Sequence, residues 1–208
     1  MTNILIVTSS ALGASSASTR IADEYEARLR AAHPGVEIVR RDVGADTIPH
    51  LTADTVGAIR GANDTDAQRR TMALSDRLIA ELQAAELIVI ASPMYNFGIS
   101  STLKAWFDHV LRAGVTFRYT ESGPEGLLKG KQAVVIESRG GLYSEGPGAA
   151  LNSQEPHLRT MLGFMGVDEV RFVLAEKLAF GPEAVEQSIA DAVAELHGLA
   201  AAQLALAA

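Results

Sequence analysis

The first segment of the chain with the means to do chemistry is rich in hydroxyl groups. The segment TSSALGASSASTR, residues 8–20, follows an apolar run and leads into the expected amino terminus of a helix. Hydroxyl groups and unpaired backbone N–H groups at such a terminus bind phosphate, aided by the helix dipole. The patterns GxxxxGK(S/T) and GxGxxG are both absent. We name residues 8–20 the serine loop, which predicts either a phosphate site or a turn whose serines only cap the helix.

A second segment, SPMYNFG at residues 92–98, directly follows the apolar run LIVIA. Tyr95 and Phe97 offer flat apolar surfaces, and the side-chain amide of Asn96 both donates and accepts hydrogen bonds. Gly98 permits a close approach of another group or a positive φ. This segment, the aromatic turn, suits a planar heteroaromatic ligand whose edge carries alternating donors and acceptors. The alternative is that the two rings pack into the core.

A third segment, ESRGG at residues 137–141, ends a further apolar run. Paired glycines at the end of a strand let the backbone lie flat against a ligand and direct N–H groups at it. For an isolated Gly-Gly pair, a plain turn is the alternative. We name this segment the glycine edge.

The elements that must position these three segments are predicted by short apolar runs that alternate with longer amphipathic stretches. The apolar runs are nearly continuous and rich in Val, Ile and Leu, as in strands covered on both faces. The predicted strands are Ile4–Val7, Val36–Val39, Leu87–Ala91, Ala133–Glu137 and Val170–Leu174. The predicted helices are Ser18–Ala32, Asp66–Ala84, Ser100–Ala113, Gln154–Met165 and Pro182–Leu206.

This alternation predicts an α/β fold that forms a single domain over residues 1–208. We expect a doubly wound, five-stranded parallel sheet with helices on both faces and the flavodoxin-like strand order 2-1-3-4-5. Two connections are long: residues 42–65, with a short helix expected at Thr52–Arg60, and residues 114–130, which are polar, aromatic and glycine-rich. Loops of that length in a compact domain are usually functional or disordered.

The predicted topology brings the three segments together. Ligands of open α/β sheets bind beyond the carboxyl ends of the strands, where the strand order reverses. The serine loop, the aromatic turn and the glycine edge follow the first, third and fourth strands, next to that point. A phosphate site, an aromatic clamp and a glycine edge are the parts needed to hold flavin mononucleotide (FMN).

Composition excludes several other classes of function. The 208 residues include no cysteine, which rules out disulfides and thiolate sites within this chain. The net charge of −7 and the scattered basic residues argue against a nucleic-acid partner. No apolar stretch approaches the ~20 residues that span a bilayer, and the amino terminus lacks a basic signal-peptide region. We therefore expect a soluble cytoplasmic protein without a membrane partner.

Metal and hydrolytic sites have no support in the sequence. No two of the five histidines have the i, i+4 spacing of a helical metal site, and neither HExxH nor GxSxG occurs. We therefore expect no metal site. His109 lies within an amphipathic helix, where a structural role is expected, whereas His157 lies near the start of the helix after the fourth strand, on the ligand side of the sheet.

The same segments carry a family resemblance that extends over nearly the whole chain. The stretch SPMYNFGISSTLKAWFDHVLRAGVTFRYTESGPEGLLKGK, with the later SRGG and LGFMG, resembles the FMN-dependent NADH-azoreductases and NAD(P)H:quinone oxidoreductases of the flavodoxin-like fold. The resemblance implies a homodimer, one FMN per subunit, and ligand sites formed at the dimer interface.

Residue by residue, the resemblance assigns three groups of FMN contacts. The phosphate would be held by Ser10, Ser16, Ala17 and Ser18. The isoalloxazine ring would be lined by Met94, Tyr95, Asn96 and Phe97. The pyrimidine edge of the ring would meet Ser138, Arg139, Gly140 and Gly141. Ala17 replaces a polar residue that relatives often have, which removes a side-chain donor but no backbone N–H.

The implied activity is the transfer of electrons from NADH or NADPH through the flavin to quinones and azo compounds. One flavin face that serves donor and acceptor in turn implies ping-pong kinetics. The backbone N–H groups of Gly140 and Gly141 would stabilise negative charge on the reduced ring. No side chain is required as a catalytic acid if water supplies the protons, and Phe117, Tyr119 and His157 are the candidate residues of the substrate pocket.

Two other functions are compatible with the sequence. A flavodoxin-type electron carrier would bind FMN but turn over no small substrate, and a binding or regulatory domain of the same fold would bind no flavin. The aromatic insertion at residues 114–130 favours the enzyme. The choice between NADH and NADPH and the physiological acceptor are not determined by the sequence.

Overall fold

The computed structural model describes residues 3–205, with side chains through residue 199. Its main sheet has five parallel strands in the order β2-β1-β3-β6-β7. Numbered along the chain within this sheet, the strands run 2-1-3-4-5, so the predicted doubly wound order is confirmed. The bounds are β1 Asn3–Thr8, β2 Glu37–Asp42, β3 Leu87–Pro93, β6 Gln132–Ser138 and β7 Glu169–Ala175.

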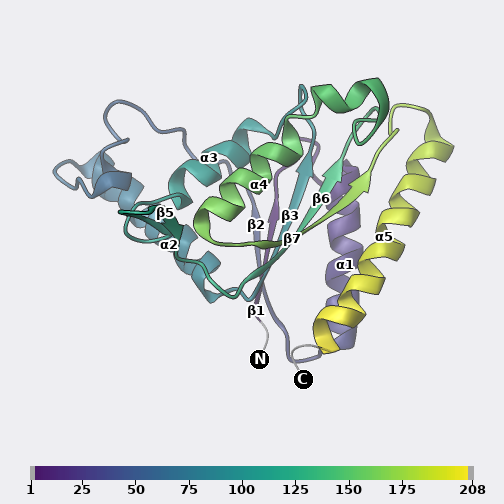
Figure 1. Ribbon diagram of the computed structural model, residues 1–208, viewed down its shortest axis with the longest axis horizontal. Coiled ribbons are helices and arrows are strands. Elements are labelled where there is room, and N and C mark those ends of the chain that lie inside the picture. Colours follow the sequence, from purple (N-terminus) through teal and green to yellow (C-terminus); the bar gives the residue numbers. More distant parts are fainter. Residues whose placement is uncertain (1–2, 206–208) are drawn as a thin grey trace.

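Helices cover both faces of this sheet, as Figure 1 shows. The helices α1 (Ala17–Ala32) and α5 (Pro182–Ala205) lie on one face, and α2 (Asp66–Ala84), α3 (Ser101–Val110) and α4 (Gln154–Met165) lie on the other. All five lie within about three residues of their predicted bounds, and the expected last residue of the final helix, Leu206, lies outside the described residues.

The core consists of two apolar layers separated by the sheet. Alternate residues of β1 point to opposite faces: Leu5 and Val7 pack with α2, α3 and α4, whereas Ile4 and Ile6 pack with α1 and α5. The central strands β1, β3 and β6 are buried along nearly their whole length, which explains their continuous apolar sequences.

The edge strand β2 differs from the prediction that every strand is covered on both faces. Val39 is 46% exposed, and the strand runs on through Arg40 and Arg41 to Asp42. Arg40 pairs with carboxylates of α1, and Arg41 pairs with Glu81 of α2. Ionic contacts to the flanking helices thus replace part of the apolar cover at this edge.

Helix α3 ends three residues before its predicted end at Ala113. The hydroxyl of Thr116 donates to the carbonyl of Val110 at 2.7 Å and accepts from the N–H of Arg112 at 3.0 Å. This side chain takes up backbone groups that a further helical turn would have paired, so the helix stops at Val110.

The two long connections differ in how much regular structure they contain. In residues 42–65 the helix expected at Thr52–Arg60 is reduced to a 3-10 turn, η2, at Ala58–Arg60. Residues 114–130 form an antiparallel hairpin of β4 (Phe117–Thr120) and β5 (Gly123–Gly126). Two further 3-10 turns, η1 (Gly13–Ser15) and η3 (Gly146–Leu151), lie in the loops after β1 and β6. Among the described residues, no helix is both long and apolar enough to cross a bilayer.

Candidate cofactor site

The serine loop and the aromatic turn lie side by side after the neighbouring strands β1 and β3. The Tyr95 hydroxyl accepts a hydrogen bond from the N–H of Ala11 at 3.2 Å and lies 3.3 Å from the Ser10 hydroxyl. The Ser9 hydroxyl donates to the carbonyl of Ala91 at 2.9 Å. These contacts join two segments more than 80 positions apart in the sequence, as the predicted topology requires.

The aromatic turn is a tight two-residue turn in a rare conformation. Tyr95 and Gly98 exchange two backbone hydrogen bonds, of 2.9 and 3.1 Å, across Asn96 and Phe97. Asn96 and Phe97 have φ values of 49° and 71°, as in a type I′ turn. The positive φ considered for Gly98 therefore belongs to these two residues instead. The left-handed backbone conformation is energetically unfavourable for a Phe residue, and such strain is concentrated at functional sites.

The conformation of the turn presents Asn96 and Phe97 outward. Both side chains are exposed, so these two positions do not belong to the core. Within residues 3–205, the side-chain amide of Asn96 has no hydrogen-bond partner. The Phe97 carbonyl accepts from the N–H of Ser153 at 3.0 Å, which fixes the turn against the start of α4. Asn96 is thus held rigidly with its donor and acceptor unused.

The serines at the start of α1 do not cap the helix, although capping was the alternative explanation for them. Ser16 occupies the N-cap position without accepting a hydrogen bond from a helix N–H, and its hydroxyl lies 3.1 Å from that of Ser18. Both side chains are buried. In the described part of the chain, the N–H groups of Ala17, Ser18 and Thr19 have no acceptor. This donor set fits a phosphate group, and the lack of a polar side chain at Ala17 removes none of its backbone donors.

The glycine edge is held by its carbonyl groups, so its N–H groups stay available. The carbonyls of Gly140 and Gly141 accept from the N–H groups of Ala179 at 2.9 Å and Lys177 at 3.0 Å. The N–H groups of the two glycines have no acceptor among residues 3–205. A Cβ at Gly141 would lie 3.0 Å from the ring of Tyr143, so no larger residue fits there without displacing that ring. The backbone therefore offers donors suited to an electron-rich ring edge.

Ser138 and Met94 connect the glycine edge to the aromatic turn. The N–H of Met94 donates to the carbonyl of Ser138 at 2.8 Å, and Pro93 and Ser138 pair in the β3–β6 register. The Ser138 side chain is nearly buried. The two segments predicted to contact one ring are thus directly bonded to each other.

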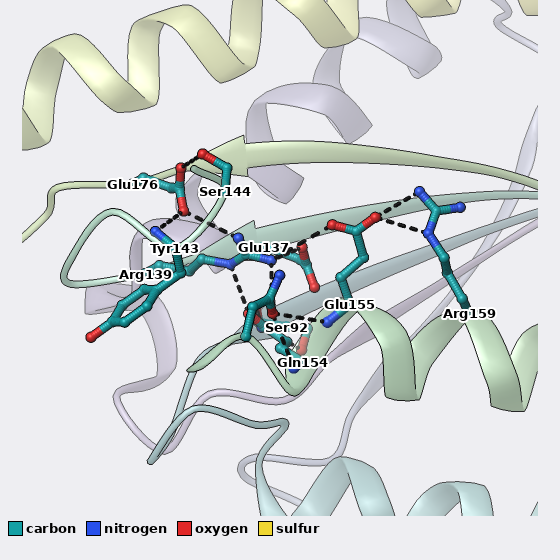
Figure 2. A network of polar contacts seen from close by, with 10 residues as sticks. Ser92, Glu137, Arg139, Tyr143, Ser144, Gln154, Glu155, Arg159 and Glu176 are labelled. Carbon is teal, nitrogen blue, oxygen red and sulfur yellow. Dashed lines mark hydrogen bonds and ion pairs between the residues drawn. The ribbon is translucent and has the colours of Figure 1, made fainter. Parts of the chain in front are cut away.

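The side chain of Arg139, a residue expected to meet the pyrimidine edge, lies in a buried polar cluster. Its side chain is fully buried and donates to Gln154 at 3.1 Å, to Glu176 at 3.1 Å and to Glu137 (Figure 2). Its backbone N–H and carbonyl pair with Ala175 and Leu178. Buried carboxylates and the Gln154 amide thus hold the guanidinium behind the glycine edge.

Two carboxyl groups of this cluster have shifted pKa values. Burial raises the pKa of Glu137 to about 7, against the opposing charge of Arg139. One oxygen of Glu137, Oε1, is buried without a hydrogen-bond partner, as expected for a carboxyl that carries a proton for part of the time. Burial would also raise the pKa of Glu176, but hydrogen bonds from Ser144, the Tyr143 N–H and Arg139 outweigh it and lower that pKa.

An open hollow of about 660 Å³ borders the aromatic turn and the start of α3. Its lining includes Tyr95, Asn96, Lys104 and His157. Burial and the nearby Lys104 lower the pKa of His157, so that the imidazole is neutral over more of the physiological range. His157 is thus placed beside the predicted flavin contacts.

The other two candidate pocket residues lie elsewhere in this chain. Phe117 is 8% exposed and packs against Phe164, with ring centroids 4.6 Å apart. Tyr119 is 74% exposed on the hairpin, which contacts the carboxyl end of α4 rather than its amino end. The close approach of Gly126 to Gly166 fixes the hairpin there, so neither residue lines the hollow beside Asn96.

The histidines and acidic residues form no metal centre in the part of the chain that the structure describes. His109 is buried, and its Nε2 lies 2.9 Å from the carbonyl of Pro49. This contact attaches the connection 42–65 to α3, in agreement with the structural role expected for His109.

Sequence reasoning missed the residues that support the site from behind. Gln154 is buried and bonds both Arg139 and Ser92, and Glu176 bonds Arg139 and the N–H of Tyr143 at 2.8 Å. A buried glutamine in the first turn of a helix has no signature in apolar periodicity. The signal that the sequence does carry is local: Asn152 accepts from the N–H groups of Gln154 and Glu155, as a helix cap does.

Comparison with known proteins agrees with this architecture. A family model described as the flavodoxin-like fold matches residues 2–199. An FMN-dependent NADH:quinone oxidoreductase of Hyphomonas neptunium is 51% identical over 200 residues, which cover 96% of each chain. A protein of the same name from Escherichia coli O139:H28 is 48% identical over 204 residues, covering 97% of this chain and all of the relative.

A solved structure agrees as well. The crystal structure of an azoreductase from Bacillus anthracis superposes with a TM-score of 0.88 at 28% identity, covering 96% of this chain and 99% of the other. Full-length coverage by relatives near 50% identity, together with the confirmed strand order, shows the family. This chain belongs to the flavodoxin-like FMN-dependent NADH:quinone oxidoreductases and azoreductases.

Proposed function

We propose that this protein is an FMN-dependent NADH:quinone oxidoreductase that also cleaves azo compounds reductively. The observation that carries the proposal is the set of unpaired donors at the carboxyl edge of the sheet. Backbone N–H groups of residues 17–19, the Asn96 amide and the N–H groups of Gly140 and Gly141 lack protein acceptors within residues 3–205. A ligand with a phosphate at one end and a hydrogen-bonding ring at the other would satisfy all of them.

The two ends of this donor set have separate roles. The amino terminus of α1, with the hydroxyls of Ser10, Ser16 and Ser18, would bind the phosphate and so fix the position of the cofactor. Met94, Tyr95, Asn96 and Phe97 would line the ring. The glycine amides would meet its pyrimidine edge, where the N–H groups of a rigid backbone stabilise negative charge.

FMN supplies the redox chemistry, and the chain positions it, excludes water and fixes the access of substrates. The hollow beside Asn96 and His157 would admit the flat nicotinamide of NADH and then a flat acceptor. Because one site would serve both reactants in turn, we expect ping-pong kinetics. In this proposal water supplies the protons, and no side chain is required as a catalytic acid.

The homodimer implied by the resemblance is part of the proposal. Four exposed apolar side chains lie in loops that follow strands at the same edge of the sheet: Leu12, Phe97, Leu151 and Phe180. A second copy would cover them. It would also give the exposed Tyr119 a contact, since this residue does not reach the hollow of its own chain.

A steady-state assay tests the function. The purified protein, reconstituted with FMN, is given NADH or NADPH with either menadione or an azo dye. We expect turnover well above that of free FMN, parallel double-reciprocal lines and a preference for NADH. FMN binding without turnover above free FMN would instead identify a flavodoxin-type electron carrier. A protein that gains no flavin spectrum would be a flavin-free domain of the same fold.

A further inference from the structure

Behind the proposed flavin contacts, a buried polar cluster connects three elements that are far apart in the sequence. Arg139 follows β6, Glu176 follows β7 and Gln154 opens α4 (Figure 2). The Arg139 guanidinium donates to Gln154 and Glu176 at 3.1 Å each, and to Glu137 at the end of β6. None of these atoms lines the hollow beside Asn96.

Gln154 extends the cluster to the other flavin-facing segment. Its amide nitrogen donates to the Ser92 carbonyl at 2.8 Å and lies 3.1 Å from the Ser92 hydroxyl, while its amide oxygen accepts from Arg139. The residue before Gln154 makes a second link to the aromatic turn: the N–H of Ser153 donates to the Phe97 carbonyl at 3.0 Å. The two ends of one buried glutamine therefore link the aromatic turn to the glycine edge.

Glu176 extends the cluster in the opposite direction. It accepts from the N–H of Tyr143 at 2.8 Å and from the Ser144 hydroxyl. The residues just after it fix the glycine edge through the bonds from Lys177 and Ala179 to the carbonyls of Gly141 and Gly140. The orientation of the two glycine N–H groups thus depends on where β7 is held relative to β6.

We propose that Arg139 and Gln154 are positioning residues that set the separation and orientation of the Asn96 amide and the Gly140–Gly141 N–H groups, the groups that would meet opposite parts of one flavin ring. This inference rests on the proposed function. Catalysis by fixed dipoles requires donors held in place before reaction, and a buried fork with three partners restricts motion more than solvent-exposed turns do. Arg139 acts through the backbone and touches neither substrate nor cofactor.

The charges of the cluster explain why an arginine is needed. Glu137 and Glu176 bond to the guanidinium directly, and Glu155 lies 4.0 Å from it. A planar guanidinium offers five donors spread over three nitrogens, whereas the compact ammonium of lysine offers three donors from a single nitrogen. Arg139→Lys keeps the positive charge but cannot keep all the bonds.

The test compares two variants with a matched control. Arg139→Lys and Gln154→Ala remove parts of the cluster, and Gln154→Ala leaves every charge in place. The control is Arg112→Lys, because Arg112 is also largely buried and bonds the Ser75 hydroxyl at 3.0 Å and Asp76 at 2.6 Å, but lies beyond the opposite end of α3. All are measured for folding by circular dichroism, for FMN affinity, and for the reduction potential of bound FMN.

We expect each cluster variant to weaken FMN binding about tenfold, the effect of losing one or two well-placed hydrogen bonds. The potential of bound FMN should become more negative, since misplaced glycine N–H groups stabilise added negative charge less well. The control should change neither quantity. In the FMN-free protein, amide hydrogen exchange should accelerate at residues 94–98 and 138–144 in the cluster variants alone.

The outcomes separate this inference from the proposed function. If the wild-type protein binds no FMN, the proposed function is overturned, and so is the inference that rests on it. If the wild type binds FMN but folded cluster variants keep its affinity, potential and exchange rates, the inference alone is overturned. Should Arg139→Lys fail to fold, the same comparison is decided by Gln154→Ala.

Discussion

At the scale of single residues, the site is a set of polar groups that the protein leaves unpaired. Asn96 is held at a φ of 49° in a turn closed by two backbone hydrogen bonds, yet its side-chain amide has no partner within residues 3–205. An asparagine tolerates this conformation better than most residues, so the same residue supplies both the backbone geometry and the donor.

The first prediction concerns Asn96. Asn96→Ala should weaken FMN binding by about 1–3 kcal/mol, the cost of leaving a buried polar partner on the ligand unpaired. Fluorescence titration of FMN measures this loss. Asn96→Asp serves as a control, because it keeps an acceptor and the left-handed backbone while it removes the amide donor. An FMN affinity that is unchanged in the alanine variant would exclude Asn96 from the site.

The second prediction concerns the pH dependence of stability. Because the pKa of Glu137 is raised from 4.5 to about 7, the folded protein binds more protons than the unfolded one between these values. The stabilising effect of this proton is complete below pH ~4.5 and is lost as the pH rises through ~7. Glu137→Gln mimics the protonated form and removes this dependence. The groups that face Glu137 are Arg139, Glu155 and Glu176, and the substitution leaves all three in place.

Urea unfolding of both proteins at pH 5 and pH 7 measures this effect. The free energy of unfolding of the variant, relative to the wild type, should increase toward pH 7 by at most about 1.4 kcal/mol per pH unit. Identical slopes for the two proteins would show that Glu137 has an ordinary pKa.

At the scale of elements, two glycines decide where the β4–β5 hairpin docks. A Cβ on Gly126 would lie 2.1 Å from the backbone N of Gly166, which itself ends α4 at a φ of 94°. The N–H of Leu128 donates to the carbonyl of Met165 at 2.8 Å in the same contact. Because the atoms nearest to this Cβ belong to the backbone of Met165 and Gly166, the clash cannot be relieved by a change of side-chain rotamer.

The third prediction follows from this contact. Gly126→Ala should destabilise the protein by roughly 2–4 kcal/mol, because overpacking against backbone forces the hairpin away from α4. Thermal unfolding measures it. Gly163→Ala is a matched control, since a Cβ at that position meets no atom within 4 Å and alanine favours the helix. A Gly126 variant as stable as the wild type would contradict the close packing.

At the scale of the whole molecule, we propose that the donors from three strand ends serve one ligand, which should stabilise the entire fold. With FMN at about 100 times its Kd, the gain is about 2.7 kcal/mol. For a chain of this length that corresponds to a rise in Tm of roughly 5–10 °C. Differential scanning fluorimetry with and without FMN is the measurement, and riboflavin, which lacks the phosphate, is the control. An equal shift with riboflavin would remove the serine loop from the site.

The fifth prediction concerns assembly. Light scattering should give twice the chain mass of 22.0 kDa, because the exposed apolar side chains at the carboxyl edge need cover. Phe180 is 67% exposed and lies outside the proposed flavin contacts. Phe180→Asp should therefore weaken the dimer, whereas the same change at an exposed polar position such as Gln187 should not. A monomeric wild type would refute the proposed interface.

The sequence determined the five strands of the main sheet, the five long helices and the three segments that follow β1, β3 and β6. These features depend on local patterns: buried parallel strands need continuous apolar runs, and amphipathic helices need a 3.6-residue period. The serine loop, the aromatic turn and the glycine edge could be located because they interrupt those patterns at strand ends. The end of α3 escaped prediction, since it depends on one hydroxyl, that of Thr116.

Only the tertiary structure decided what supports the site. Arg139 lies 15 positions from Gln154 and 37 from Glu176, and no periodicity relates residues at such separations. Buried polar partners are chosen by the packing of β6, β7 and α4, because a charge removed from water must find its bonds where the fold places them. For the same reason the Arg139 side chain lies among buried carboxylates, and Phe117 and Tyr119 lie on a hairpin at the carboxyl end of α4.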